Sequence, residues 1–205
     1  DHRLGSNKAP PAIISIFIGE ELTEILESIE NGTLYRDKQR RQMEIGASVL
    51  PHFPRDNTDR NRTSPFAFTG DKFEFRMVGS NFSLADPNVV LNTIVAESLS
   101  EFADILEKSG NLKEDLNNLV RNTIKKHKRI IFNGNNYSEE WVKEAEKRGL
   151  LNLTTTPDAL PYFLSEKNVR LFTKHNVFSK TEMISRYEIL LENYSKTIHI
   201  EALTM

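Results

Sequence analysis

The feature that most limits the fold is a helical pattern of apolar residues that continues almost without a break from residue 87 to residue 205. Residues 87–110 and 112–132 place apolar side chains three and four positions apart, which is typical of long amphipathic helices. Residues 138–149 and 156–178 show the same spacing over shorter stretches. The sequence therefore predicts that its second part is an assembly of helices.

Residues 179–205 are predicted to form the last helix. Ser179 is the expected N-cap and Glu182 follows three residues later, which is the pattern of a capping box. Helices normally end near Gly, Asn or Pro, and this pattern runs out at Met205 without such a signal. Because the chain also begins with Asp1, we expect it to be an internal piece of a longer protein.

Strands are predicted in the first third of the chain. Residues 13–18 are β-branched and aromatic, as expected of a short buried strand, and residues 20–32 then form a helix that stops at Asn-Gly. A charged loop with three prolines covers residues 33–65. Loops of this length are usually functional or disordered. Residues 72–78 alternate as in a strand.

The composition excludes several classes of protein. With 205 residues, 38% of them hydrophobic and 27% charged, the chain is long enough for one globular domain with a sizeable core. Without cysteine it has no disulfide framework, thiolate metal site or cysteine nucleophile. No apolar run approaches the roughly 18 residues of a membrane span, and no signal peptide begins the chain. We expect a cytoplasmic protein that has no contact with membranes.

Nucleic acid is not an expected partner. The formal net charge is −2, so the chain as a whole has no basic field. Six basic residues, with His127 counted, lie between Arg121 and Arg129. They stand near the end of a predicted helix, where the helix dipole favours cations, and no aromatic residues are interleaved with them. The five histidines do not have the spacing of metal ligands.

A row of alternating charges marks residues 72–76. Since successive side chains of a strand point to opposite faces, Phe73 and Phe75 share one face, and we expect them to pack against the core. The other face carries Lys72, Glu74 and Arg76. Two interpretations remain open at this point. The row is either a half-solvated strand with neighbouring ion pairs, or a metal-binding carboxylate flanked by cations that neutralise a polyphosphate.

Three segments of the chain resemble type III glutamine synthetases: "RLGSNKAPPAIISIFIG", "DRNRTSPFAFTGDKFEFR" and "WVKEAEKRGLLNLTTTPDAL". The resemblance covers the chain in order from Asp1 to Met205. It implies an α+β fold, with strands of a glutamine synthetase catalytic sheet in residues 1–86. A predominantly α-helical C-terminal region, truncated at Met205, would occupy residues 87–205.

The resemblance also implies a role for each of five residues. Arg3 would bind the carboxylate of the substrate glutamate, and Arg76 would bind glutamate or γ-glutamyl phosphate. Arg62 would stabilise phosphoryl transfer from ATP, and Lys72 would contact the ATP phosphates. Glu74 would be a ligand of Mg²⁺ or Mn²⁺. Arginine suits the position of Arg62 because its planar fork spans two phosphoryl oxygens.

The reaction that the resemblance implies is the ATP-dependent ligation of glutamate and ammonia to glutamine, by way of γ-glutamyl phosphate. The parent protein would be a homo-oligomer of two stacked rings, with active sites between neighbouring subunits. We expect the piece represented by this chain to be inactive alone, because the resemblance places most metal ligands outside it.

One position departs from the family pattern. Where "NEAPPAI" is expected the chain reads "NKAPPAI", so Lys8 replaces a glutamate of the flap that would bind ammonium and accept its proton. Two like charges about 4 Å apart repel by about 4 kcal/mol at an effective dielectric constant of about 20. A degenerate paralogue with an assembly or regulatory role, an altered sequence and a shifted flap all remain open as explanations.

Overall fold

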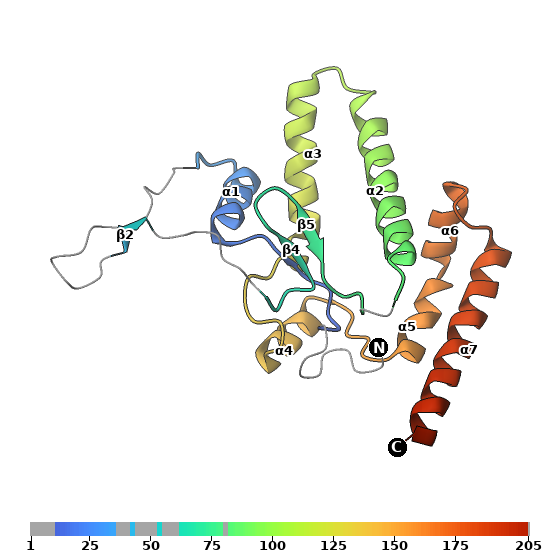
Figure 1. Cartoon of the computed structure of the whole chain (residues 1–205). Coiled ribbons are helices and arrows are strands. Elements are labelled where there is room, and N and C mark those ends of the chain that lie inside the picture. Colours follow the sequence, from blue (N-terminus) through green and yellow to red (C-terminus); the bar gives the residue numbers. More distant parts are fainter. Residues whose placement is uncertain (1–10, 36–41, 44–52, 55–61, 80–81, 205) are drawn as a thin grey trace.

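The computed structural model describes residues 11–35, 42–43, 53–54, 62–79 and 82–204. Helices dominate this part of the chain, as Figure 1 shows. The helices are α1 (Glu20–Asn31), α2 (Ala85–Leu106), α3 (Leu112–His127), the 3-10 helix η1 (Lys128–Ile130), α4 (Glu139–Lys147), α5 (Thr156–Phe163), α6 (Glu166–Lys174) and α7 (Lys180–Thr204). The strands are β1 (Ile16–Phe17), β2 (Gln42–Met43), β3 (Phe53–Pro54), β4 (Phe66–Phe68) and β5 (Phe73–Phe75). The predicted α+β class is confirmed.

The main sheet has the strand order β1-β4-β5. Strand β1 is parallel to β4, and β4 forms an antiparallel hairpin with β5. The other edge of β1 meets the segment that follows η1, where Ile131 bridges Ile16 and the N–H of Phe132 donates to the carbonyl of Ile16 at 3.0 Å. Strands β2 and β3 form a separate antiparallel pair. The sheet thus joins the first third of the chain to the helical part.

The two faces of this sheet differ in burial. The register places Phe17, Ala67 and Glu74 side by side on one face, where Phe17 is 3% exposed and Ala67 is 1% exposed. On the opposite face Phe73 stacks against Phe66 with the ring centroids 5.4 Å apart, yet Phe73 is 51% exposed. The expectation that both phenylalanines of the 72–76 row are buried is therefore wrong for Phe73. The core in this structure lies on the side of Glu74.

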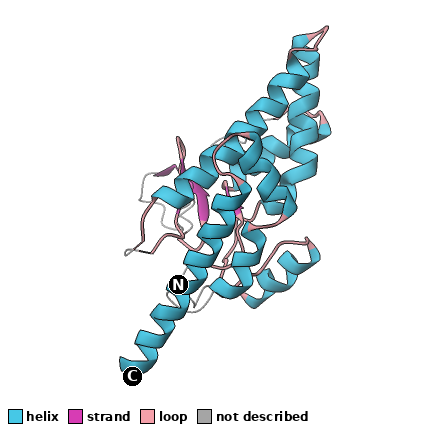
Figure 2. Ribbon diagram, turned by 90° about the vertical axis from the view of Figure 1, so that its right-hand side faces the viewer, coloured by secondary structure: helices cyan, strands magenta, loops and turns pink. Residues whose placement is uncertain are grey.

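Most of the helices pack in two groups, which meet where α6 contacts α2. Helices α2 and α3 form a long antiparallel pair that extends away from the sheet, and α1 packs on α3 (Figure 1). Helices α5 and α6 pack on α7, whose last turns lie at the other end of the molecule (Figure 2). No helix in the described residues is both long enough and apolar enough to cross a membrane.

Several predicted helix ends are confirmed. The N–H of Ser179 donates to Glu182 Oε2 at 2.7 Å, and the N–H of Glu182 donates to Ser179 Oγ at 3.2 Å, which is a complete capping box. Gly32 ends α1 in the left-handed conformation with φ 66°, where an L side chain would be strained. Ser138, the first residue of the helix predicted over residues 138–149, caps α4 by accepting from the N–H of Trp141 at 3.2 Å.

A small buried core ties α4 to the first third of the chain. Ile13, Trp141 and Ala145 are its buried members, and Phe132 and Leu150 pack against them. Because Ile13 comes from the segment before β1, this core and the sheet make the same connection between distant parts of the sequence. The predicted boundary between residues 1–86 and 87–205 stays a prediction.

Candidate functional site

The hairpin of β4 and β5 presents the charged residues that the sequence singles out. Its turn is closed by the N–H of Thr69, which donates to the carbonyl of Lys72 at 2.9 Å. Gly70 in this turn has φ 99°, a conformation that favours glycine. The register then sets Glu74 opposite Ala67, on the buried face of the sheet.

Glu74 and Arg76 form an ion pair on this hairpin. The Nε and Nη2 atoms of Arg76 both donate to Glu74 Oε2, at 3.1 and 2.9 Å. The side chain of Glu74 is 40% exposed and that of Arg76 is 30% exposed, so the pair lies at the border between core and solvent. Charge-assisted hydrogen bonds of this kind orient the guanidinium plane. Of the predicted row, the structure brings Glu74 and Arg76 together, whereas Lys72 is exposed beside the turn.

The segment that begins at Arg62 lies against the same hairpin. The carbonyl of Pro65 accepts from the N–H of Arg76 at 2.8 Å, which extends the pairing of β4 and β5 by one hydrogen bond. Ser64 and Pro65 are buried, while the side chain of Arg62 is exposed. Arg62 is therefore three residues from a backbone contact with Arg76. Arg3 and Lys8 lie outside the described residues.

Glu74 has the chemistry of one metal ligand. Mg²⁺ and Mn²⁺ prefer carboxylate oxygens, and both hydrogen bonds from Arg76 end on Oε2. The second oxygen, Oε1, can therefore face a cation while the ion pair persists. Among the described residues no three side chains of His, Asp or Glu gather as a metal site. The fit of this part of the chain to a divalent cation consists of this single carboxylate.

A buried polar network beside Arg62 was missed by the sequence reasoning. Its centre is the loop at residues 133–138, between η1 and α4, where Asn136 is 4% exposed. The N–H of Asn136 donates to Thr63 Oγ1 at 3.0 Å, and its Oδ1 accepts from Ser15 Oγ at 2.5 Å. The Asn-Gly-Asn-Asn run at 133–136 was the available signal, because amides in such a run commonly satisfy backbone groups of neighbouring loops.

The basic cluster at the end of α3 has partners within the fold. Arg121 Nε donates to the carbonyl of Ile29 at 3.3 Å, and Lys128 forms an ion pair with Glu30 at 2.7 Å. Both contacts lie at the last turns of α1, where cations favourably meet the exposed carbonyls of a helix end. These two cations therefore connect α3 and η1 to α1.

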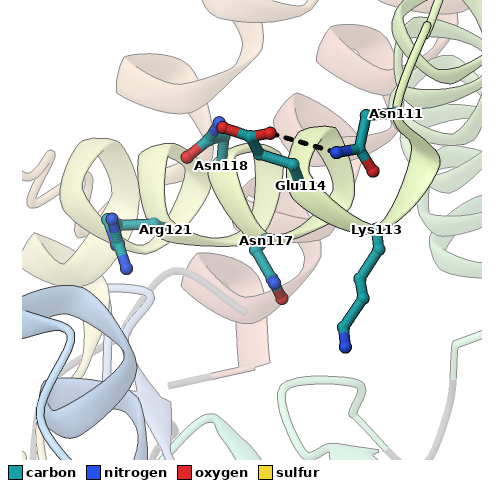
Figure 3. A pocket seen from close by; sticks show the side chains of 6 residues that line it. All are labelled: Asn111, Lys113, Glu114, Asn117, Asn118 and Arg121. Carbon is teal, nitrogen blue, oxygen red and sulfur yellow. Dashed lines mark hydrogen bonds between the residues drawn. The ribbon is translucent and has the colours of Figure 1, made fainter.

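An open polar hollow of about 380 Å³ lies on α3. Figure 3 shows its lining, in which Asn111 Nδ2 donates to Glu114 Oε2 at 3.1 Å. The lining residues are Asn111, Lys113, Glu114, Asn117, Asn118 and Arg121. All six belong to α3 and its N-cap, so the hollow is the surface of one helix and not a cleft between elements. Its charges are of both signs, and it is not assigned a ligand.

Comparisons with known proteins place the chain in a family. A family model described as the glutamine synthetase C-terminal domain matches residues 115–205. The chain is 50% identical over 206 residues to a glutamine synthetase from Butyrivibrio fibrisolvens, which covers 100% of this chain and 29% of that protein. It is 49% identical over 205 residues to a Type-3 glutamine synthetase from Dictyostelium discoideum, covering 98% of this chain and 28% of that protein.

A glutamine synthetase from Bacteroides fragilis (strain YCH46) is 36% identical over 209 residues, with 98% of this chain and 28% of that protein covered. The chain thus spans less than a third of the length of each of these relatives. The matches confirm the resemblance to type III glutamine synthetases that the sequence motifs indicated. The chain belongs to the glutamine synthetase family.

Proposed function

We propose that the protein to which this sequence belongs is an ATP-dependent ligase that joins ammonia to glutamate and makes glutamine. The observation that supports this most is the Glu74–Arg76 pair at 2.9 Å, held on a hairpin whose neighbouring segment begins at Arg62. A carboxylate and two guanidinium groups on adjoining backbone are suited to a site that handles phosphates. The names of the relatives give glutamine as the product, and glutamate, ammonia and ATP complete the reaction that we propose.

The proposed chemistry has two steps. An oxygen of the glutamate side-chain carboxylate attacks the γ-phosphorus of ATP, a P–O bond forms, and the bond to ADP breaks. The nitrogen of ammonia then attacks the carbonyl carbon of γ-glutamyl phosphate, a C–N bond forms and the C–O bond to phosphate breaks. Inorganic phosphate leaves with the proton that the nitrogen loses. Both steps place negative charge on phosphoryl oxygens, so cations held in fixed positions lower the barrier.

The residues of this chain take separate parts in the proposal. Arg62 and Lys72 contact the phosphates, and Arg3 and Arg76 hold glutamate or its phosphorylated form. Glu74 has two parts, because Oε2 orients Arg76 while Oε1 can serve as one ligand of Mg²⁺ or Mn²⁺. A bound divalent cation would supply neutralisation of phosphate charge. The ion pair keeps the Arg76 guanidinium in place before the substrate arrives, which reduces the reorganisation that the reaction requires.

The alternative function is an assembly or regulatory role in a catalytically degenerate paralogue. Lys8 favours this alternative, since an ammonium group at a position that should bind ammonium reverses the local charge. A homo-oligomeric double ring and a cytoplasmic location belong to either version of the proposal. In the first version the 205-residue chain contributes part of a site and does not turn over alone.

The test is an assay of the intact protein that contains this sequence. Glutamate, ammonium, ATP and Mg²⁺ are supplied, and glutamine and ADP are measured together. Formation of both products in equal amounts supports the ligase. A Lys8→Glu variant that gains activity from an inactive wild type supports the degenerate paralogue. If neither protein forms glutamine, the ligase proposal is wrong.

A further inference from the structure

We infer that the loop at residues 133–138 positions Arg62 through Thr63, so that Thr63 and Asn136 are positioning residues of the reaction. The inference rests on the proposed function, because Arg62 has a part in catalysis only if phosphoryl transfer takes place. Neither positioning residue has a titratable side chain. Their effect would therefore come from geometry alone.

Thr63, the residue directly after Arg62, contacts the 133–138 loop. Thr63 Oγ1 accepts from the N–H of Asn136 at 3.0 Å and lies 3.4 Å from the carbonyl of Gly134, to which it donates. A hydroxyl that accepts from one backbone group and donates to another favours the orientation that serves both. The side chain of Thr63, and with it the backbone at Arg62, is thereby attached to the 133–138 loop.

Asn136, the residue of the loop that contacts Thr63, is itself buried. Its Oδ1 accepts from Ser15 Oγ at 2.5 Å, and its Nδ2 donates to the carbonyl of Gly134 at 3.4 Å. Ser15 is fully buried and Asn136 nearly so. Buried polar groups are costly when they lose a partner, so this network has one favourable arrangement and resists small displacements. The loop is consequently held in place by hydrogen bonds of buried groups.

The loop is also attached to the main sheet through Asn133. Asn133 Oδ1 accepts from the N–H groups of Ile18 and Gly19 at 3.2 and 3.0 Å, directly after β1. Asn133 Nδ2 donates to Thr23 Oγ1 at 2.8 Å. Because β1 pairs with β4, and β4 with the strand that leads to Arg76, the loop and the sheet together set Arg62 and Arg76 relative to one another.

A displacement of Arg62 should lower the rate of the proposed reaction. A displacement of about 1 Å of a group that acts on the transition state can cost about 100-fold in rate, even when the change is remote from the chemistry. Removing one hydroxyl that fixes the backbone at Arg62 should therefore lower kcat much more than it disturbs the fold. Binding of glutamate, which the proposal assigns to other residues, should change little.

The experiment compares Thr63→Val with Thr63→Ser in the intact protein. Valine has nearly the shape of threonine but cannot hydrogen-bond, whereas serine keeps the hydroxyl. We expect Thr63→Val to lower kcat about 10-fold to 100-fold with the KM for glutamate within about 3-fold of wild type. Thr63→Ser should recover most of the wild-type kcat. Thermal unfolding of each variant is measured, and Thr63→Ala replaces Thr63→Val if the latter does not fold.

A double-mutant cycle with Arg62→Lys separates positioning from a general structural role. If Thr63 acts through Arg62, adding Thr63→Val to Arg62→Lys should lower kcat no further. Additive losses, or equal activity of Thr63→Val and Thr63→Ser, would overturn the inference while leaving an active wild type. A wild-type protein that forms no glutamine would instead contradict the proposed function, and the inference with it.

Discussion

The rings of Phe132 and Trp141 stack with their centroids 3.8 Å apart and an interplanar angle of 8°. Trp141 is 1% exposed and belongs to α4, while Phe132 lies between η1 and the 133–138 loop. Through this stacked pair, the residue that precedes the loop packs against the core. The pair also explains why the position two residues after Phe132 is a glycine, because a Cβ atom at Gly134 would lie 2.6 Å from Phe132 Cζ.

The variant Gly134→Ala should destabilise the chain. The added methyl group must displace the Phe132 ring, which is held against Trp141, so we expect a loss of about 1–3 kcal/mol in the free energy of unfolding. Urea unfolding followed by fluorescence measures this loss, since Trp141 is the only tryptophan of the 205 residues. Gly110→Ala is the matched control, because a Cβ there meets nothing within 4 Å. Equal effects of the two variants would contradict the packing described for Phe132.

The variant Ser179→Ala should weaken the start of α7. It removes the hydroxyl that accepts from the N–H of Glu182 at 3.2 Å, and loss of such an N-cap costs about 1 kcal/mol. The measurement is the midpoint of urea unfolding followed by circular dichroism. Ser195→Ala, in the exposed middle of the same helix, should be neutral or slightly stabilising because alanine has the higher helix propensity. A loss as large in Ser195→Ala would argue against the capping box.

The contact of α2 with α6 should depend on pH. Glu97 accepts from Lys174 at 2.8 Å and lies 2.6 Å from His175 Nε2. The hydrogen bond with Lys174 has the largest effect on the pKa of Glu97, which it lowers, and the one with His175 lowers this pKa further. A carboxylate whose folded pKa is lowered adds stability above its ordinary pKa of about 4.5, and this stability is lost as the pH falls through the lowered pKa.

The free energy of unfolding of Glu97→Gln is therefore expected to fall below that of the wild type at neutral pH, and the difference should shrink as the pH falls below about 4.5. Urea unfolding at several pH values gives this difference. Glu188→Gln, an exposed position within α7, is the control and should track the wild type. A difference that stays constant throughout the acid range would show that Glu97 does not act through its charge.

Helix ends could be predicted from the sequence because their signals are local. The Ser179–Glu182 capping box and the stop at Gly32 involve residues within a few positions of each other, and both appear in the structure. The burial of β5 could not be predicted in the same way. Alternation places Phe73 and Glu74 on opposite faces, but which face is covered depends on the register of β1 and β4, which bury Phe17 and Ala67.

In the candidate site, too, the local contacts could be predicted from the sequence and the long-range contacts could not. The proximity of Glu74 and Arg76 follows from the period of two in a strand, and in the structure the two residues form the neighbouring ion pair that the half-solvated interpretation of the row predicts. The contact of the 133–138 loop with Thr63 was missed, because Asn136 contacts Thr63 and Ser15 across 73 and 121 residues of sequence. Contacts of that range follow from the tertiary fold and leave no periodic pattern in the chain.

The most direct test of the proposed ligase site is the Mg²⁺ dependence of glutamine formation by the intact protein with Glu74→Ala. We predict that activity is abolished at Mg²⁺ concentrations that saturate the wild type, since the variant would lose the proposed metal ligand and the partner that orients Arg76. Glu188→Ala serves as the control with an ordinary surface carboxylate removed. A Glu74→Ala protein that keeps the wild-type rate and the wild-type Mg²⁺ dependence would contradict the assignment of this hairpin to the active site.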